Sequence, residues 1–218
     1  MAATLQWLFE RLDSHYGPQS WWPAETPFEV MVGAILTQNT AWTNVEKAIA
    51  NLKTHHALSA RAIADAPHEQ LAEWIRPSGY FNIKATRLQN FCRWYLEPGR
   101  AAQLKTLPTE QLRHALLSVN GVGPETADDM VLYAFHHPVF VIDAYTRRLF
   151  SRLGLIQGDE AYETLRSMVE DHFGRSEKQV ALYNEFHALI VAHAKDYCRK
   201  RPLCKGCPLV RRCPSREL

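Results

Sequence analysis

Four cysteines are crowded into the carboxyl-terminal end of this chain of 218 residues. Cys198, Cys204, Cys207 and Cys213 fall within the last 21 residues with the spacing C-x5-C-x2-C-x5-C, and the rest of the chain contains only Cys92. Four clustered thiols can form disulfides, bind zinc or hold an iron–sulfur cluster. No other feature of the sequence restricts the chemistry of the chain as strongly.

The spacing of the cysteines separates these three possibilities. Disulfides are the weakest, because the sequence shows no secretory signal and disulfide frameworks belong to oxidising compartments. Zinc sites are usually built from two C-x2-4-C pairs that lie far apart. Here one C-x2-C pair is flanked on both sides by gaps of five residues, which suits thiolates reaching different corners of a [4Fe-4S] cube. The spacing favours the cluster and leaves zinc as the alternative.

The tail that carries the cysteines is also basic. Residues 195–218 contain eight Lys or Arg against two Asp or Glu, whereas the whole chain has a formal net charge of +2 at pH 7. Arg199, Lys200 and Arg201 lie between the first two cysteines, where a rigid loop would present them to a partner. Such a loop is suited to contact phosphates. The alternative is that these residues are simply a basic chain end.

Composition and length fit an ordinary globular protein. Apolar residues make up 46% and charged residues 22% of the chain. The first 17 residues have the apolar spacing of an amphipathic helix and not of a signal peptide. The longest apolar stretch, 30–36, is far shorter than the ~20 residues of a membrane span. We therefore expect a cytoplasmic protein with no membrane partner.

The apolar periodicity is helical nearly throughout, so the sequence predicts an all-α protein. Thr26 and Pro27 have the character of a helix cap and first turn. Ile83, at helical spacing from Leu88, is expected to point inward. Residues 139–142 are apolar but too few for a sheet. The expected helices after the first are 27–38, one around 45–52, 59–65, 68–75, 83–96, 108–118, 124–135, 144–153, 159–173 and 178–196.

A Gly-x-Gly turn joins two of these helices. Gly121 and Gly123 allow positive φ and a close approach of the backbone to a partner. Pro124 follows at the start of a helix, whose free N–H groups form an anion site. The turn can thus approach a nucleic-acid phosphate without regard to base sequence. A tight turn without function is the alternative.

Asp143 directly precedes a predicted helix and follows an apolar run. As a helix cap its carboxylate would be held rigidly and stabilised by the helix start. Taken alone, this segment favours a structural cap.

These features together resemble the endonuclease III superfamily of helix-hairpin-helix DNA glycosylases over almost the whole chain. One departure is the first cysteine gap, five residues here where the usual pattern has six. Five matches carry the resemblance in the family's order: Leu36–Thr40 (LTQNT), Gly79–Ala85 (GYFNIKA), Gly121–Ala127 (GVGPETA), Asp143 at the catalytic aspartate, and the four cysteines at the cluster loop.

The resemblance implies a two-lobed, all-α fold with a carboxyl-terminal [4Fe-4S] loop. It places a helical barrel carrying the hairpin in residues 24–137. A cluster domain with the catalytic aspartate would then comprise residues 138–218, with 1–23 packed on it. The implied partner is double-stranded DNA containing a damaged base, bound by a monomer that is nucleoid-associated when on DNA.

Glu125 stands where bifunctional relatives carry lysine. That lysine attacks the sugar to form a Schiff base, which leads to strand cleavage. A glutamate cannot form a Schiff base, so Asp143 remains as the catalyst, stabilising an oxocarbenium-like sugar and orienting or deprotonating water. The sequence therefore predicts a monofunctional glycosylase of base excision repair. The role of Tyr145, where many relatives have histidine, stays open.

Three tryptophans point to the substrate. Trp21 and Trp22 of the WWP segment, Trp42 after LTQNT, and Glu125 are together similar to the 3-methyladenine DNA glycosylases of this superfamily, where they would form the base pocket. An alkylated purine is cationic, so its stacking against an aromatic side chain in a pocket without water gains ~2 kcal/mol of cation–π energy. The alternative is that these tryptophans are ordinary residues of the protein core.

The resemblance also assigns residues that grip DNA. Gln38 and Tyr80 would fill the gap left by a flipped base. Two alternatives to the alkylpurine hypothesis remain: a glycosylase of the same fold for another base, including a bifunctional lyase, and a non-catalytic DNA-binding module with a cluster. The other DNA-binding candidates are Lys84, Gly121, Gly123, Arg199, Lys200 and Arg201.

Overall fold

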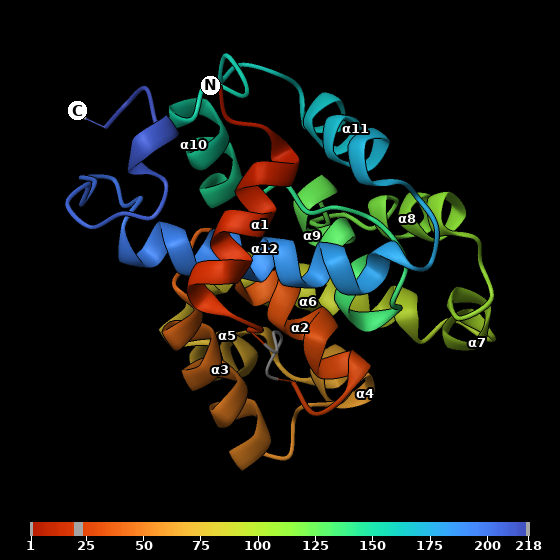
Figure 1. Cartoon of the computed structure of the whole chain (residues 1–218). Coiled ribbons are helices and arrows are strands. Elements are labelled where there is room, and N and C mark those ends of the chain that lie inside the picture. The colour runs from red at the N-terminus through yellow and green to blue at the C-terminus, as the bar shows by residue number, and fades with distance from the viewer. Residues whose placement is uncertain (1, 20–23, 217–218) are drawn as a thin grey trace. The chain divides into compact units, whose positions relative to one another are not determined.

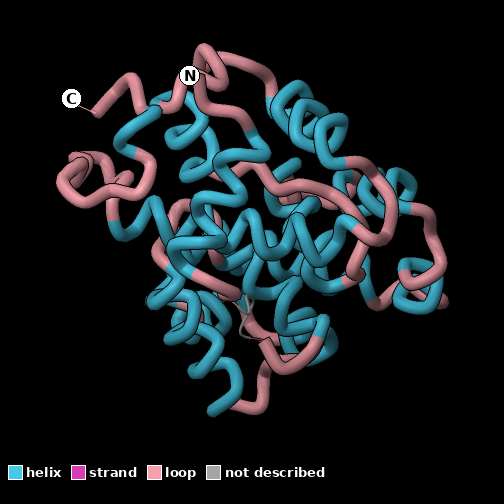
Figure 2. Tube along the Cα trace, in the orientation of Figure 1, coloured by secondary structure: helices cyan, strands magenta, loops and turns pink. Residues whose placement is uncertain are grey.

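The computed structural model describes residues 2–19 and 24–216. The chain forms two compact units: unit 1 comprises the described residues of Met1–Trp21 and Pro138–Leu218, and unit 2 those of Trp22–His137. Both units are built of helices joined by loops, without a strand among the described residues (Figures 1 and 2). The expectation of an all-α protein is therefore confirmed. Trp21 and Trp22 lie outside the described residues.

Unit 2 contains most of the short helices. η1 is a 3-10 turn and η2 is a π-helical turn. The elements of unit 2 are α2 (Pro27–Leu36), α3 (Trp42–Thr54), α4 (Ala60–Asp65), α5 (His68–Trp74), η1 (Arg76–Ser78), α6 (Phe81–Tyr95), α7 (Arg100–Leu104), α8 (Thr109–Leu117), α9 (Pro124–Asp129) and η2 (Met130–Ala134).

α2 forms the centre of unit 2. The Thr26 side chain accepts a hydrogen bond from Glu29 N, and Pro27 occupies the first turn, as the sequence predicts. Val30 to Leu36 are all buried, so the part of this helix after its first turn is apolar on every side, as expected inside a core. It ends at Leu36, two residues before the predicted end, which leaves Gln38 in the turn that follows.

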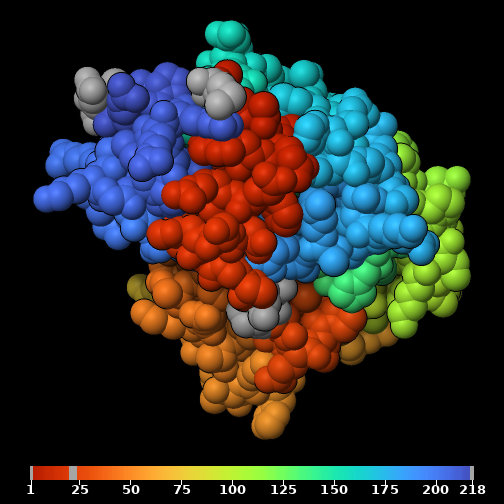
Figure 3. Space-filling model, in the orientation of Figure 1, coloured from red at the N-terminus to blue at the C-terminus, as the bar shows by residue number. Residues whose placement is uncertain are grey.

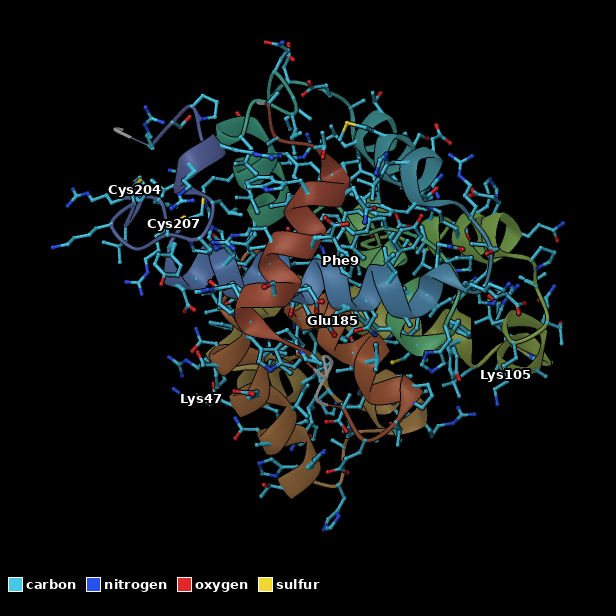
Figure 4. All side chains as sticks on the ribbon, in the orientation of Figure 1. Phe9, Lys47, Lys105, Glu185, Cys204 and Cys207 are labelled. Atoms are coloured by element: carbon cyan, nitrogen blue, oxygen red, sulfur yellow. The ribbon has the colours of Figure 1, made fainter. Side chains whose placement is uncertain are left out.

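Unit 1 contains fewer and longer helices, packed around aromatic side chains. Phe186 of α12 lies 5.6 Å from Phe9, 5.4 Å from Phe140 and 5.7 Å from Phe173, measured between ring centroids. Figure 1 shows α1 crossing α12, and Phe9 is labelled on α1 in Figure 4. The elements of unit 1 are α1 (Leu5–Tyr16), α10 (Ala144–Arg152), α11 (Tyr162–Phe173), α12 (Gln179–Asp196) and the 3-10 turn η3 (Val210–Arg212).

In unit 1, α1 contacts the segment that follows α12. The Arg11 Nε donates to the Pro208 carbonyl over 3.1 Å, and the Arg212 guanidinium lies 4.7 Å from the centre of the Trp7 ring. Figure 3 shows the red amino-terminal helix beside the blue carboxyl-terminal segment. α1 therefore supports the segment that carries the cysteines.

Among the described helices, none has the length and apolar character that crossing a bilayer requires.

The structure corrects two details of the expected helices. The helix predicted to begin at Ile83 begins at Phe81, and Ile83 is 55% exposed instead of pointing inward. The helix predicted for 159–173 begins at Tyr162, because Glu160 binds the loop amides of Gln157 and Gly158. The short helix α7 was not expected.

The apolar connector before Asp143 is held by α11 and not by a sheet. The Phe140 amide donates to Glu170 Oε1 over 3.1 Å, and the Ile142 amide donates to the Tyr162 hydroxyl over 3.3 Å. Both acceptors come from α11. Buried amides need partners, and these two side chains supply them where a neighbouring strand would otherwise be required. The connector therefore enters α10 in a fixed position.

Candidate DNA-binding and catalytic site

The Gly-x-Gly turn joins α8 and α9 into a helical hairpin. Gly121 has a φ of +99°, a conformation that favours glycine. A buried ion pair braces the two helices: Arg113 Nε lies 2.6 Å from Asp128 Oδ1, and Arg113 Nη2 lies 3.2 Å from Oδ2. Gly123, Pro124 and Glu125 at the start of α9 are exposed. The hairpin thus presents a rigid, exposed turn on unit 2.

A cluster of polar side chains connects this turn to the LTQNT segment. Gln38 Nε2 donates to the Gly121 carbonyl over 3.1 Å and to Thr126 Oγ1 over 2.9 Å. Arg87 of α6 donates to Gln38 Oε1. The aliphatic part of Arg87 also covers Gly121, since a Cβ at position 121 would lie within 3.0 Å of three Arg87 carbons. Gln38 is therefore held by both the hairpin and α6.

Lys84 lies inside unit 2 and not on its surface. Only 1% of the residue is exposed, and its Nζ donates to the carbonyls of Leu36 over 2.8 Å and Ser78 over 2.6 Å. Burial, and to a lesser extent the charge of Arg87, lowers the pKa of Lys84 to about 8, so the ammonium is still protonated at pH 7. The expectation of a direct DNA contact is corrected: Lys84 ties together the segments that lead to Gln38 and Tyr80.

Tyr80 projects from the loop that Lys84 holds. Its φ of +46° places a bulky aromatic residue in the left-handed region, and the residue is 68% exposed. This backbone conformation is unfavourable for such a residue and is found where the surrounding structure enforces it. Ile83, three residues on, is the neighbouring exposed apolar side chain. Together they give unit 2 an apolar projection.

Trp42 lines a pocket of about 160 Å³ together with Glu29, Glu46, Ile49, Ala50 and Lys53. The Trp42 Nε1 donates to Glu46 Oε1 over 3.0 Å, which orients the ring. Glu29 is buried and pairs with Lys53 over 3.1 Å. The pocket therefore combines an aromatic wall with two carboxylates and one ammonium.

Asp143 caps α10 in unit 1, as the sequence predicts. Its Oδ1 accepts from the Thr146 amide over 2.7 Å, and its Oδ2 lies 3.5 Å from His187 Nε2 on α12. Burial alone would raise the pKa of Asp143, but the nearby His187 and the hydrogen bond from the Thr146 amide together lower it below its ordinary value. The side chain is 13% exposed, so an ionised carboxylate is held almost entirely within the protein.

All four carboxyl-terminal cysteines line one cavity of about 30 Å³. All five thiols of the chain are unbridged, and Figure 4 shows Cys204 and Cys207 in the loop after α12. The rest of the lining is largely apolar and includes Leu149, Leu153 and Leu209. Within the described residues, no three His, Cys, Asp or Glu side chains are arranged to hold a metal ion.

α10 and the cysteine loop are linked by arginines. Arg152 Nη1 donates to Cys198 Sγ over 3.3 Å and to the Arg199 carbonyl over 2.6 Å, and its Nη2 donates to the Lys200 carbonyl over 2.9 Å. Arg148 donates to the Cys198 carbonyl over 2.8 Å. The loop backbone is thus fixed from α10, while Arg199, Lys200 and Arg201 are exposed.

Several residues of this site were not predicted from the sequence. His187 gave one weak signal, a histidine within the apolar run of α12. Arg87 and Arg152 gave none, because a surface arginine and an arginine that holds a loop look alike in sequence.

Residues 32–173 match the family model of HhH-GPD superfamily base excision DNA repair proteins. The chain belongs to this superfamily. The protein named "Putative DNA repair glycosylase MJ1434" from Methanocaldococcus jannaschii is 45% identical over 96% of this chain and 95% of its own length. Endonuclease III of Sulfolobus acidocaldarius is 27% identical over 83% of this chain and 78% of its own.

Solved structures agree with the assignment of this HhH-GPD protein. A non-covalent endonuclease III–DNA complex has a TM-score of 0.83 at 20% identity and covers 98% of this chain and 95% of that one, which shows the shared fold. The H. pylori 3-methyladenine DNA glycosylase MagIII, bound to 1,N6-ethenoadenine, has a TM-score of 0.70 at 30% identity and covers 86% of this chain and 97% of that one. The chain is a DNA glycosylase of the HhH-GPD type.

Proposed function

We propose that this glycosylase is monofunctional and removes N-alkylated purines such as 3-methyladenine. The proposal is carried by two features of the chain: a largely buried Asp143 whose pKa is lowered, and a glutamate, Glu125, at the hairpin position where a Schiff-base lysine would stand. The chain would then hydrolyse the glycosidic bond, release the base and leave an abasic site in an intact strand.

The chemistry follows from the charge of Asp143. As the glycosidic bond of an alkylated purine breaks, positive charge develops on the sugar, and a fixed carboxylate stabilises it. The same carboxylate can orient or deprotonate the attacking water. An alkylated purine is already cationic and leaves without protonation, so this reaction needs no general acid.

The composition of the pocket lined by Trp42 is suited to binding a cationic base. An aromatic face attracts a cation, and the two carboxylates Glu29 and Glu46 outnumber the single ammonium of Lys53. The MagIII relative, 30% identical, acts on 3-methyladenine by its name. Glu125 does not line this cavity, and its place in the base pocket, like that of Trp21 and Trp22, remains a proposal. The exposure of Glu125 is compatible with a contact to substrate.

The function divides between the two units. We propose that unit 2 grips DNA through the hairpin glycines, Gln38 and Tyr80, and that unit 1 supplies Asp143 and the basic loop of Arg199, Lys200 and Arg201. We also propose that the protein acts as a cytoplasmic, nucleoid-associated monomer.

The cysteine cavity fits an iron–sulfur cluster by its donor set. Four thiols share one apolar cavity, and Arg152 donates an N–H to Cys198 Sγ, an interaction that also tunes the potential of clusters. We propose that Cys198, Cys204, Cys207 and Cys213 hold a [4Fe-4S] cluster. When bound, the cluster would supply a rigid anchor for the basic loop.

The first test is a panel of duplexes that each contain one lesion. We expect release of 3-methyladenine without strand cleavage, and little covalent adduct when an abasic duplex is treated with borohydride. Trp42→Ala should slow release about 10-fold to 100-fold, by analogy with the ~1–3 kcal/mol of base–aromatic stacking, whereas Trp42→Phe keeps an aromatic wall and most of the rate.

Three results would contradict this function. A strongly trapped adduct would show that an amine acts as the nucleophile, in the manner of a bifunctional lyase. If the protein excised only a neutral base, whether deaminated, mispaired or oxidised, the result would favour a glycosylase of the same fold that acts on another substrate. Binding without any excision would favour a non-catalytic module.

The cluster is tested by metal analysis of the purified chain. About four iron and four sulfide per chain are expected. Cys204→Ser should lower the iron content and weaken DNA binding, because the basic loop loses its anchor. Cys92→Ala is the control, since Cys92 lies buried in α6 and should leave the iron content unchanged. One zinc and no iron would refute the cluster.

Tyr80→Ala should weaken binding to damaged DNA and leave the melting temperature nearly unchanged. The side chain is exposed, and filling the gap of a flipped base is worth ~1–3 kcal/mol when an aromatic ring stacks there, which corresponds to about 10-fold to 100-fold in affinity. Fluorescence anisotropy with an abasic-site duplex measures the effect. Tyr80→Phe should retain most of the affinity, and equal affinity of parent and Tyr80→Ala would exclude this role.

A further inference from the structure

His187 of α12 faces the carboxylate of Asp143 from inside unit 1. The side chain of His187 is 6% exposed, and its Nε2 lies 3.5 Å from Asp143 Oδ2. Its ring meets Phe140 edge to face, with centroids 6.5 Å apart and planes at 84°. This packing limits the rotation of the imidazole, so the nitrogen stays directed at the carboxylate.

Three helices hold Asp143 from different directions. α10 contributes the Thr146 amide, which binds Oδ1 over 2.7 Å. α11 holds the preceding connector through Tyr162 and Glu170. α12 contributes His187 on Oδ2. The two oxygens therefore have separate partners, and the one that faces His187 is the oxygen that α10 leaves uncapped.

Burial makes this second partner necessary. A nearly buried carboxylate without a partner would become neutral, since burial disfavours the charged form. A neutral acid cannot stabilise a cationic sugar. The proximity of His187, 3.5 Å away, is the largest of the influences that keep the pKa of Asp143 low against its burial.

We propose that His187 is a positioning residue for Asp143: its Nε2–H donates to Oδ2, fixes the carboxylate and keeps it ionised during catalysis. The inference rests on the proposed function insofar as Asp143 is the catalyst. A separation of 3.5 Å is at the outer limit of a hydrogen bond, and catalytic hydrogen bonds are often long before substrate is bound and then tighten.

The neighbouring ionisable groups contact other partners. Tyr162 of α11 accepts from the Ile142 amide, and Glu170 of α11 pairs with Arg175 over 3.0 Å. On α10, Arg147 donates to the Glu160 carbonyl over 2.8 Å, and Arg148 lies over the Tyr145 ring. Within the part of the chain that the structure describes, His187 is an ionisable side chain placed against the Asp143 carboxylate.

Two variants of His187 test the proposal. His187→Phe keeps a ring in the same packing but removes the donor, whereas His187→Gln keeps an N–H donor. His187→Phe should lower the single-turnover rate on a 3-methyladenine duplex about 100-fold, the effect of a catalytic group displaced by roughly 1 Å. The acid limb of its pH–rate profile should move to higher pH. His187→Gln should recover much of the rate and move the limb back.

A second measurement needs no substrate. Carbon-13 NMR titration of the Asp143 carboxyl should give a higher pKa in His187→Phe than in the parent, with His187→Gln between them. Circular dichroism and the affinity for an abasic-site duplex, both expected near parent values, show that the variants fold.

The possible failures can be told apart. If Asp143→Asn still excises the base, the proposed catalyst is wrong. If Asp143→Asn is inactive but His187→Phe keeps the parent rate, acid limb and carboxyl titration, only the role of His187 is overturned. A rate lost in His187→Phe without a change in either the acid limb or the titration would reduce His187 to a packing residue and would also overturn the proposal.

Discussion

Asp143→Asn is expected to abolish base excision while leaving the fold intact. Removal of a positioned acid–base group typically costs about 10²-fold to 10⁴-fold, and here the same change also removes the charge that stabilises the cationic sugar. The structural function of the side chain survives, because asparagine caps helices about as well as aspartate does. The Thr146 amide therefore keeps an oxygen acceptor at the start of α10.

Single-turnover release of 3-methyladenine, with binding to an abasic-site duplex measured beside it, separates the two functions of Asp143. Asp143→Ala is the matched comparison, since it removes the cap as well and should cost ~1 kcal/mol of unfolding free energy. Equal melting temperatures of Asp143→Asn and the parent, together with lost turnover, would fit the catalytic role. Excision by Asp143→Asn at the parent rate would exclude it.

Asp128→Ala is expected to destabilise the protein by ~3–5 kcal/mol, the largest effect that we predict on stability. Removing one partner of a buried pair leaves the other charge uncompensated. The side chains of Arg113 and Asp128 are only 7% and 0% exposed, and they bind through two contacts. Losing this pair should loosen α8 from α9 and with them the hairpin.

Chemical denaturation measures this effect, and the chain offers two controls. Glu73→Gln removes an exposed partner of Arg76, where the side chains are 63% and 67% exposed, and should change stability by about 0–1 kcal/mol. The double variant Arg113→Met with Asp128→Leu should recover much of the loss, because an apolar pair leaves no buried charge. If Asp128→Ala lost no more unfolding free energy than Glu73→Gln, the buried ion pair would not stabilise the hairpin.

Signals between residues close in sequence predicted most of the fold. The cap at Thr26, the proline after Gly123 and the cap at Asp143 each act within one helical turn, so the sequence contains all the information needed. The family was predicted from five short matches in the right order, and the family model confirms it. Site roles that came from the resemblance remain predictions.

Side chains whose partners are distant in sequence could not be predicted. Ile83 has the spacing of a core residue, yet it faces solvent, and its neighbour Lys84 turns inward instead. The reason is the pair of carbonyls that receive the Lys84 ammonium, one of them at the end of α2. The proposed role of His187 likewise depends on its contact with Asp143, which caps another helix. Burial of a polar group depends on such partners, which periodicity does not reveal.

Because Arg87 covers Gly121, the two positions differ in how freely they can be substituted during evolution. A lineage can shorten Arg87 and so open the space in which a Cβ at position 121 would clash, but the φ of +99° would still penalise every other residue there. Shortening Arg87 also removes its hydrogen bond to Gln38 Oε1 and leaves the hydrogen bonds of Gln38 to the hairpin. Arg87 can therefore change first, although the hairpin turn is then held less firmly, whereas Gly121 is retained in either case.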